Sequence, residues 1–141
     1  MKRTRISIVG LLKVLVVVAV TLALAACSPG GDSPQDLVRS FVSAIDSENY
    51  SSIQSYLDSG AERYNTANTA NYWTTYFPTA GAPYSINSLS GDGPVTAVIA
   101  SGGNDSTGTY EFTFSGSEGN LFNDSDYKIR TITTGSTTVF E

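Results

Sequence analysis

Histidine is absent from this 141-residue chain, and cysteine occurs once, at position 27. Histidine is the commonest general base and metal ligand in proteins, so its absence excludes Ser-His and Cys-His nucleophile pairs. One cysteine also excludes an intramolecular disulfide and any zinc site built from several thiolates. The sequence therefore predicts a domain held together by packing alone, with no metal, no cofactor and no catalytic residues of these kinds.

Basic residues are scarce as well, with 8 Lys and Arg against 13 Asp and Glu. Four of the eight basic residues lie within the first 13 positions, and all 13 acidic residues lie after position 26. The chain from residue 27 onwards thus has four basic and 13 acidic residues, a formal charge of −9. Because affinity for nucleic acid comes largely from Lys and Arg on phosphates, no nucleic-acid partner is expected.

The N-terminus combines a basic start with a short apolar run. Lys2, Arg3 and Arg5 precede an uncharged run of 11 residues, 14–24. That run is well short of the roughly 20 residues that a membrane-spanning helix needs. A basic segment followed by a short apolar segment is typical of a secretory signal peptide.

The residues Leu24-Ala25-Ala26-Cys27 end this apolar run and resemble the bacterial lipobox. The resemblance implies diacylglycerol on the Cys27 sulfur and cleavage between Ala26 and Cys27. Two acyl chains anchor a protein stably, whereas one is marginal. We therefore expect a cell-membrane lipoprotein on the extracytoplasmic face, in contact with the membrane through the lipid on Cys27. The alternative is an ordinary signal peptide, cut nearby, that leaves Cys27 as a free thiol.

Three segments follow from this interpretation: a signal peptide at 1–26, a lipidated cysteine with a short tether at 27–32, and one domain at 33–141. A flexible tether of five residues reaches only about 12 Å, which keeps the domain close to the bilayer. The sequence contains no internal repeat or coiled-coil heptad, and it leaves the oligomeric state open.

Helical patterns occupy the first part of the domain. Ser33 and Pro34 are typical of a helix start, and apolar residues then recur at helical spacing as far as Ile45. A second short helix is predicted over 50–57. The segment 61–77 is rich in Asn and Thr, which are poor helix formers, and it is predicted as a loose helix or a loop that ends at Pro78.

Strand patterns follow after Pro83. Strands are predicted over 84–89, 95–101, 109–114 and 127–133, the last extended after Gly135 by 137–140. Strict alternation places Tyr110, Phe112 and Phe114 on the inner face of the third strand. The predicted fold class is α+β, with N-terminal helices packed on one face of a curved antiparallel sheet of about four strands.

Three of these segments, 33–45, 50–57 and 127–132, resemble the nuclear-transport-factor-2-like (cystatin-like cone) superfamily, and within it small bacterial lipoproteins. The superfamily usually has Trp where this chain has Tyr127. The resemblance implies a cone-like domain with a cavity between the helices and the concave face of the sheet. Functions vary widely within the superfamily, so the fold alone does not supply one.

Some cone-fold enzymes, such as ketosteroid isomerase, pair a buried Asp base with a Tyr donor. In this sequence Asp46 and Asp58 lie near predicted helix ends, where a capping or solvated carboxylate is ordinary. Residues 123–126 (Asn-Asp-Ser-Asp) have calcium-like spacing, but Tyr127 and Lys128 follow where ligands are needed. We therefore expect neither catalysis nor a metal site.

Four aromatic residues gather in the Asn- and Thr-rich segment: Tyr72, Trp73, Tyr76 and Phe77. They either plug the open end of the cone or line a pocket for a ligand or partner, since Trp and Tyr are enriched at interfaces. The predicted function is a non-enzymatic lipoprotein that uses these residues to bind an envelope protein or a small apolar ligand. The alternatives are a cone-fold isomerase or dehydratase, and a structural subunit of an envelope or secretion assembly.

Overall fold

A computed structural model describes residues 33–117 and 126–141. The predicted signal peptide, Cys27 and its tether lie outside the described residues, as do residues 123–125 of the acidic turn. Among the described helices, none has the length and apolarity needed to cross a membrane.

The first helix, α2 (Pro34–Asp46), begins where the sequence predicts. The Ser33 hydroxyl accepts a hydrogen bond from the Asp36 N–H at 3.2 Å, and Pro34 occupies the first turn, where its missing N–H costs nothing. Two short helical turns follow, α3 (Tyr50–Ile53) and η1 (Gln54–Tyr56). Together they cover the predicted 50–57 segment almost completely.

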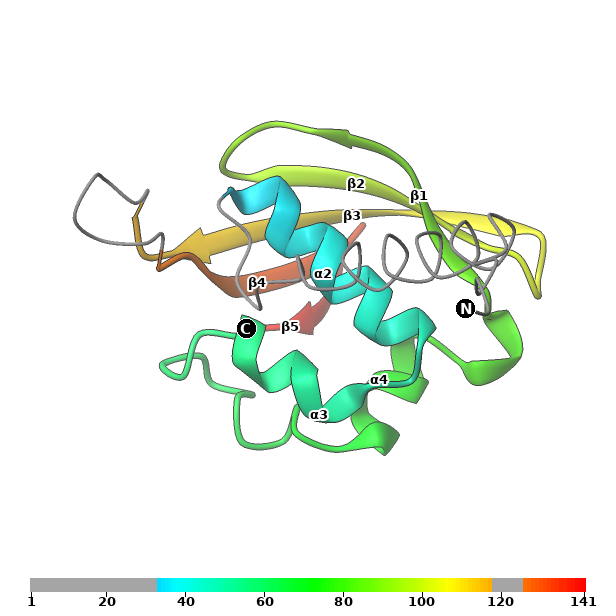
Figure 1. Cartoon of the computed structure of the whole chain (residues 1–141), viewed down its shortest axis with the longest axis horizontal. Helices are drawn as coiled ribbons and strands as arrows, with labels where there is room; N and C mark the ends of the chain where they lie inside the picture. The colour runs from blue at the N-terminus through cyan, green and yellow to red at the C-terminus, as the bar shows by residue number, and fades with distance from the viewer. Residues whose placement is uncertain (1–32, 118–125) are drawn as a thin grey trace, which may run out of the picture.

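The sheet has five antiparallel strands in sequence order: β1 (Tyr84–Ser90), β2 (Val95–Ser101), β3 (Ser106–Ser115), β4 (Lys128–Thr134) and β5 (Thr137–Phe140). The helices lie on one side of this sheet (Figure 1). The predicted α+β class is confirmed. The sheet has one strand more than the expected four, because Gly135 adopts a positive φ of 57° and lets 137–140 turn back onto β4.

The segment between the early helices and the sheet combines turns with a short helix. Residues 61–69 form turns, and α4 (Ala70–Tyr76) starts at Thr69, whose hydroxyl accepts a hydrogen bond from the Tyr72 N–H. A single 3-10 turn, η2 (Thr79–Gly81), connects α4 to β1. The helix forms despite poor intrinsic propensity, because its inner residues pack against the rest of the fold.

Aromatic side chains fill the space between α2, α4 and the sheet. We call Phe41, Trp73, Phe77 and Phe112 the buried aromatic cluster; all four are almost completely excluded from solvent. Phe41 is its centre and meets Trp73, Phe112 and Phe77 edge to face, with ring centroids 5.2, 5.7 and 6.1 Å away. Such edge-to-face pairs add to the free energy gained from burial.

The two outer edges of the sheet differ in what covers them. At β5, the Arg63 Nη1 donates to the Thr138 carbonyl at 3.1 Å, and the Tyr72 hydroxyl donates to the Val139 carbonyl. The Arg63 backbone N–H also donates to the Glu141 carbonyl at 2.7 Å. Contacts of this kind cover the β5 edge. In the described part of the chain, β1 pairs with β2 alone, so its other edge carries no partner strand.

Candidate functional site

The four predicted site residues lie on α4 and at its C-terminal end, and they form an inward pair and an outward pair. Trp73 and Phe77 point inward and belong to the buried aromatic cluster, whereas Tyr72 and Tyr76 are half-buried. The Trp73 indole N–H donates to the Ala67 carbonyl at 2.7 Å, which satisfies its only polar group inside the core. The inward pair therefore packs the interior, and only the outer pair can contact another molecule.

Tyr72 anchors the end of the chain. Besides the hydrogen bond from its hydroxyl to Val139, its ring lies 5.0 Å from that of Trp73 and 5.5 Å from that of Tyr76, centroid to centroid. Burial raises the pKa of Tyr72, an effect that the nearby Arg63 partly offsets. Its hydroxyl is used within the fold, so Tyr72 acts structurally.

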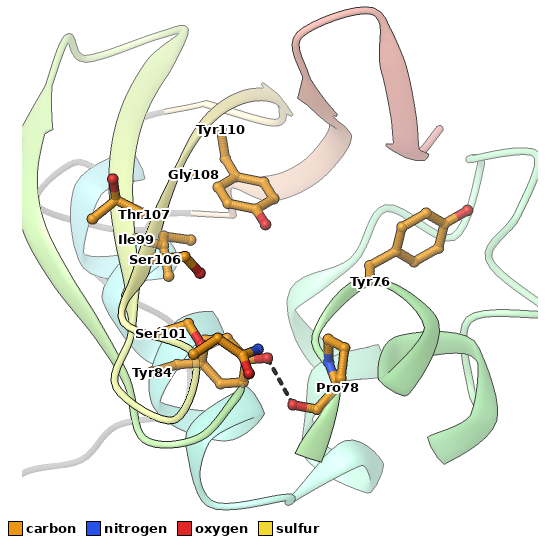
Figure 2. A pocket seen from close by; sticks show the side chains of 10 residues that line it. Tyr76, Pro78, Tyr84, Ile99, Ser101, Ser106, Thr107, Gly108 and Tyr110 are labelled. Atoms are coloured by element: carbon orange, nitrogen blue, oxygen red, sulfur yellow. Dashed lines mark hydrogen bonds between the residues drawn. The ribbon is translucent and has the colours of Figure 1, made fainter. Parts of the chain in front are cut away.

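Tyr76 instead lines an open pocket together with Tyr84 of β1 and Tyr110 of β3, as Figure 2 shows. We call this site the tyrosine pocket. It has a volume of about 190 Å³. The other residues that line it are Pro78, Ile99, Ser101, Asn104, Ser106, Thr107 and Gly108.

Phe77 packs against the rings of two of the three tyrosines. The Tyr110 ring stacks on it with centroids 5.3 Å apart and planes inclined by 26°. The Tyr84 ring meets it edge-on at 5.6 Å. The Tyr84 hydroxyl then donates to the Pro78 carbonyl at 2.8 Å (Figure 2). These contacts fix two ring positions before any ligand arrives, which lowers the entropy cost of binding.

Glycines allow the walls of the pocket to approach closely. A Cβ on Gly108 would lie 2.8 Å from a ring carbon of Tyr110, and a Cβ on Gly81 would collide with the Tyr84 hydroxyl. A Cβ on Gly103, in the turn between β2 and β3, would lie 2.7 Å from the Ala82 carbonyl oxygen. Only residues without a Cβ fit at these positions without movement.

The rim of the pocket is polar but uncharged. Ser101 donates from its hydroxyl to the Gly81 carbonyl at 2.6 Å, whereas Asn104, Ser106 and Thr107 expose their side chains. Burial raises the pKa values of Tyr84 and Tyr110, so both hydroxyls stay protonated well above neutral pH. The site therefore offers neutral hydrogen-bonding groups beside aromatic rings.

The two acids near the helix ends have structural partners elsewhere. Asp46 accepts a hydrogen bond from the Tyr84 backbone N–H at 2.6 Å, which fastens the end of α2 to the start of β1. Asp58 lies 3.2 Å from the Arg130 guanidinium. Hydrogen bonds from Ser115 and the Gly60 N–H, together with Arg130, lower the pKa of Asp58. Neither acid lines the tyrosine pocket, and the described residues hold no cluster of three metal-ligating side chains.

Sequence reasoning found Tyr76 but missed Tyr84 and Tyr110 as members of a site. These residues come from three separate elements, so no local motif connects them. Two signals were present in the sequence: the inward register of Tyr110 on its strand, and glycines at 81, 102, 103 and 108 close to the tyrosines. Comparison of the chain with models of protein families, with curated proteins and with solved structures found no match.

Proposed function

We propose that this chain is a lipid-anchored, extracytoplasmic binding module of the nuclear-transport-factor-2-like type. In this proposal residues 1–26 are a signal peptide, Cys27 carries the lipid, and the tyrosine pocket holds an uncharged group of a larger envelope molecule. The proposal joins an N-terminal sequence that resembles a lipobox to an open pocket on the folded domain.

The size of the pocket is the observation that carries the binding function. Sites for drug-sized ligands usually measure roughly 300–1,000 Å³, whereas this pocket has about 190 Å³ and opens to solvent on one side. It therefore suits one ring or one side chain, with the rest of the bound molecule outside. A larger partner that presents one such group fits better than a free small molecule.

The filled interior favours binding at the surface. A carrier of a small apolar molecule would need a dry, enclosed cavity, but the buried aromatic cluster occupies the space between the helices and the sheet. An isomerase of the ketosteroid type would need a carboxylate facing a tyrosine hydroxyl, and no acidic residue lines the tyrosine pocket. For these reasons we propose that the tyrosine pocket binds a group of a partner molecule.

The pocket lies at a distance from the end of the domain that the tether joins. Gln35, near the start of α2, donates to the Gly91 carbonyl at 3.0 Å, whereas Asp46, at its end, bonds to Tyr84 of the pocket. The pocket and the tether thus lie at opposite ends of α2. A helix of 13 residues is about 20 Å long, so the pocket lies about that far along the helix from the residue where the tether joins it.

Site-specific photo-crosslinking tests the binding function. A photoreactive residue replaces Ser106, at the rim of the pocket, in the full-length lipoprotein expressed in the bacterium that produces it. Thr109, also exposed but on the opposite face of β3, is the matched control. We expect a discrete adduct from position 106 that Tyr76→Ala weakens, and none from position 109. The same pattern at both positions, or no adduct at either, would contradict the proposal.

Metabolic labelling tests the anchor separately. We expect a palmitate analogue to label the protein, and Cys27→Ser to abolish the label and to release the protein from the membrane fraction. A wild-type protein that stays unlabelled and soluble outside the cell would exclude lipidation at Cys27. The labelling result does not depend on the crosslinking result, so the two parts of the proposal fail separately.

A structural subunit of an envelope assembly is the second candidate function. The exposed edge of β1 favours it, because an unpaired edge offers backbone N–H and C=O groups to a strand of another protein. The same crosslinking experiment covers this candidate with a photoreactive residue at the exposed Ser88 on β1. An adduct at position 88 without one at position 106 would favour assembly through the edge strand.

A further inference from the structure

We infer that the group held in the tyrosine pocket is an uncharged saccharide ring. The inference rests on the proposed function, because it names the chemistry of the ligand for the same site. It follows from three properties of the pocket: the absence of charge, the division into an aromatic and a polar side, and the opening to solvent.

The absence of charged side chains from the lining excludes several classes of ligand. None of the 10 lining residues is Asp, Glu, Lys or Arg, although the chain contains 21 charged residues. A phosphate, a carboxylate or an ammonium group would lose water on entering and would gain no opposite charge. The raised pKa values of Tyr84 and Tyr110 keep the pocket neutral over the physiological range. The ligand group is therefore neutral.

The lining has two chemical sides. Tyr76 and Tyr110 supply aromatic surface, and Ile99 adds an apolar wall. Asn104, in the turn between β2 and β3, supplies an amide, and Ser106, at the start of β3, supplies a hydroxyl. Figure 2 shows Tyr76 on the helical side of the pocket, with its ring directed away from Tyr110, and Tyr110 on the sheet side. Two kinds of surface thus meet around one space.

A wholly apolar group would match only one of these sides. It would cover the amide and the hydroxyls without pairing them, which costs free energy. A saccharide ring has an apolar C–H face for an aromatic ring and hydroxyls at its edge for the Asn104 amide and the Ser106 hydroxyl. The Tyr110 hydroxyl forms no hydrogen bond with other described residues, so it remains able to pair with a sugar hydroxyl.

The opening of the pocket suits a ring within a longer glycan. About 190 Å³ accommodates one ring, while the open side leaves room for the neighbouring units. One ring of about a dozen heavy atoms gives a dissociation constant on the order of 1 mM. Many anchored copies on one membrane would then hold a polymeric glycan far more tightly through multivalency.

Saturation-transfer NMR with methyl hexosides tests the inference. The probes are the methyl glycosides of glucose, galactose, mannose and N-acetylglucosamine, and the protein is the full-length lipoprotein in micelles of a detergent without sugar. We expect at least one probe to bind with a millimolar dissociation constant. Asn104→Ala and Tyr76→Ala should each weaken that binding at least fivefold, because both side chains line the pocket. Thr109→Ala, on the opposite face, should leave it unchanged.

Tyr110→Phe keeps the ring stacked on Phe77 and removes only the hydroxyl, so it reports on pairing without a loss of fold. We expect it to weaken binding of the same probe two- to fivefold, with an unchanged melting temperature. If no glycoside binds, if binding survives Asn104→Ala and Tyr76→Ala, or if p-cresol or tetramethylammonium binds more tightly, the saccharide inference is wrong. A persistent crosslink from position 106 in those cases would leave the proposed binding function standing.

Discussion

The buried aromatic cluster and the tyrosine pocket adjoin each other and share Phe77, yet they differ in one chemical respect. Phe77 packs against Phe41 at 6.1 Å within the core and against Tyr110 at 5.3 Å beside the pocket. The rings of Phe and Trp in this region are fully buried, whereas the tyrosines lie at the boundary with their hydroxyls near water or a carbonyl. Around Phe77, the buried rings carry no hydroxyl, whereas each aromatic residue that lines the pocket carries one.

Trp73→Ala should have the largest effect on stability. It empties the space beside Phe41 and leaves the Ala67 carbonyl without its donor. We expect a loss of about 3–5 kcal/mol in the free energy of unfolding, measured by urea denaturation with circular dichroism. Tyr76→Ala, three positions along the same helix, is the control and should lose much less, because Tyr76 is half-exposed. Equal losses would contradict the division between the cluster and the pocket.

Gly103→Ala should have the next largest effect, because a Cβ there meets backbone oxygens of Ala80 and Ala82. We expect a loss of more than about 1 kcal/mol in the free energy of unfolding, since the turn between β2 and β3 must move. Gly108→Ala meets only the ring of Tyr110, which can shift, so it should lose less. The reverse order in thermal melts would show that the turn at Gly103 is not closely packed.

Tyr72→Phe removes a hydroxyl that is used within the fold. The loss of its hydrogen bond to Val139 should lower the free energy of unfolding by about 1 kcal/mol. Tyr50→Phe is a suitable control, because the Tyr50 hydroxyl forms no hydrogen bond within residues 33–117 and 126–141. Its effect in the same urea titration should stay within about 0.5 kcal/mol. A Tyr72→Phe variant as stable as the wild type would show that the Tyr72 hydroxyl does not stabilise the fold.

Alkaline pH should produce the smallest of the four effects. Burial raises the pKa values of Tyr72, Tyr84 and Tyr110 above 10.0, so the folded state holds these phenolic protons more tightly than the unfolded state. Their contribution to stability is complete below pH of about 10 and is lost as the pH rises through the folded-state pKa values. We expect Tyr110→Phe to show a shallower fall in unfolding free energy above pH 10 than the wild type. Parallel curves would contradict a raised pKa of Tyr110 in the folded state.

Much of the fold follows from local patterns in the sequence. The start of α2 is predicted by Ser33 and Pro34, and the strands follow from alternation and from the Gly and Pro residues between them. The helix at Ala70–Tyr76 was predicted only as a loose helix or a loop, because its propensity is poor and its stability comes from distant contacts. The hydrogen bond from the Tyr72 hydroxyl to the Val139 carbonyl, 67 positions away, is of this kind.

The candidate site was predictable only in part. Tyr76 was included because it lies in an aromatic run, but that run mixes inward and outward positions of one short helix. Tyr84 and Tyr110 enter the site through the pairing of β1, β2 and β3, which depends on the register of the strands. Register is a long-range property, so a single sequence places these residues on a face without showing that they meet.

The burial of Trp73 has a practical consequence, because it is the only tryptophan in the chain. Its indole is completely enclosed and lies 5.0 Å from the ring of Tyr72. Tryptophan fluorescence therefore comes from one emitter at a single known location, which is shielded from collisional quenchers in the native state and receives excitation energy from neighbouring phenols. Loss of that shielding would report opening of the interior without any added dye.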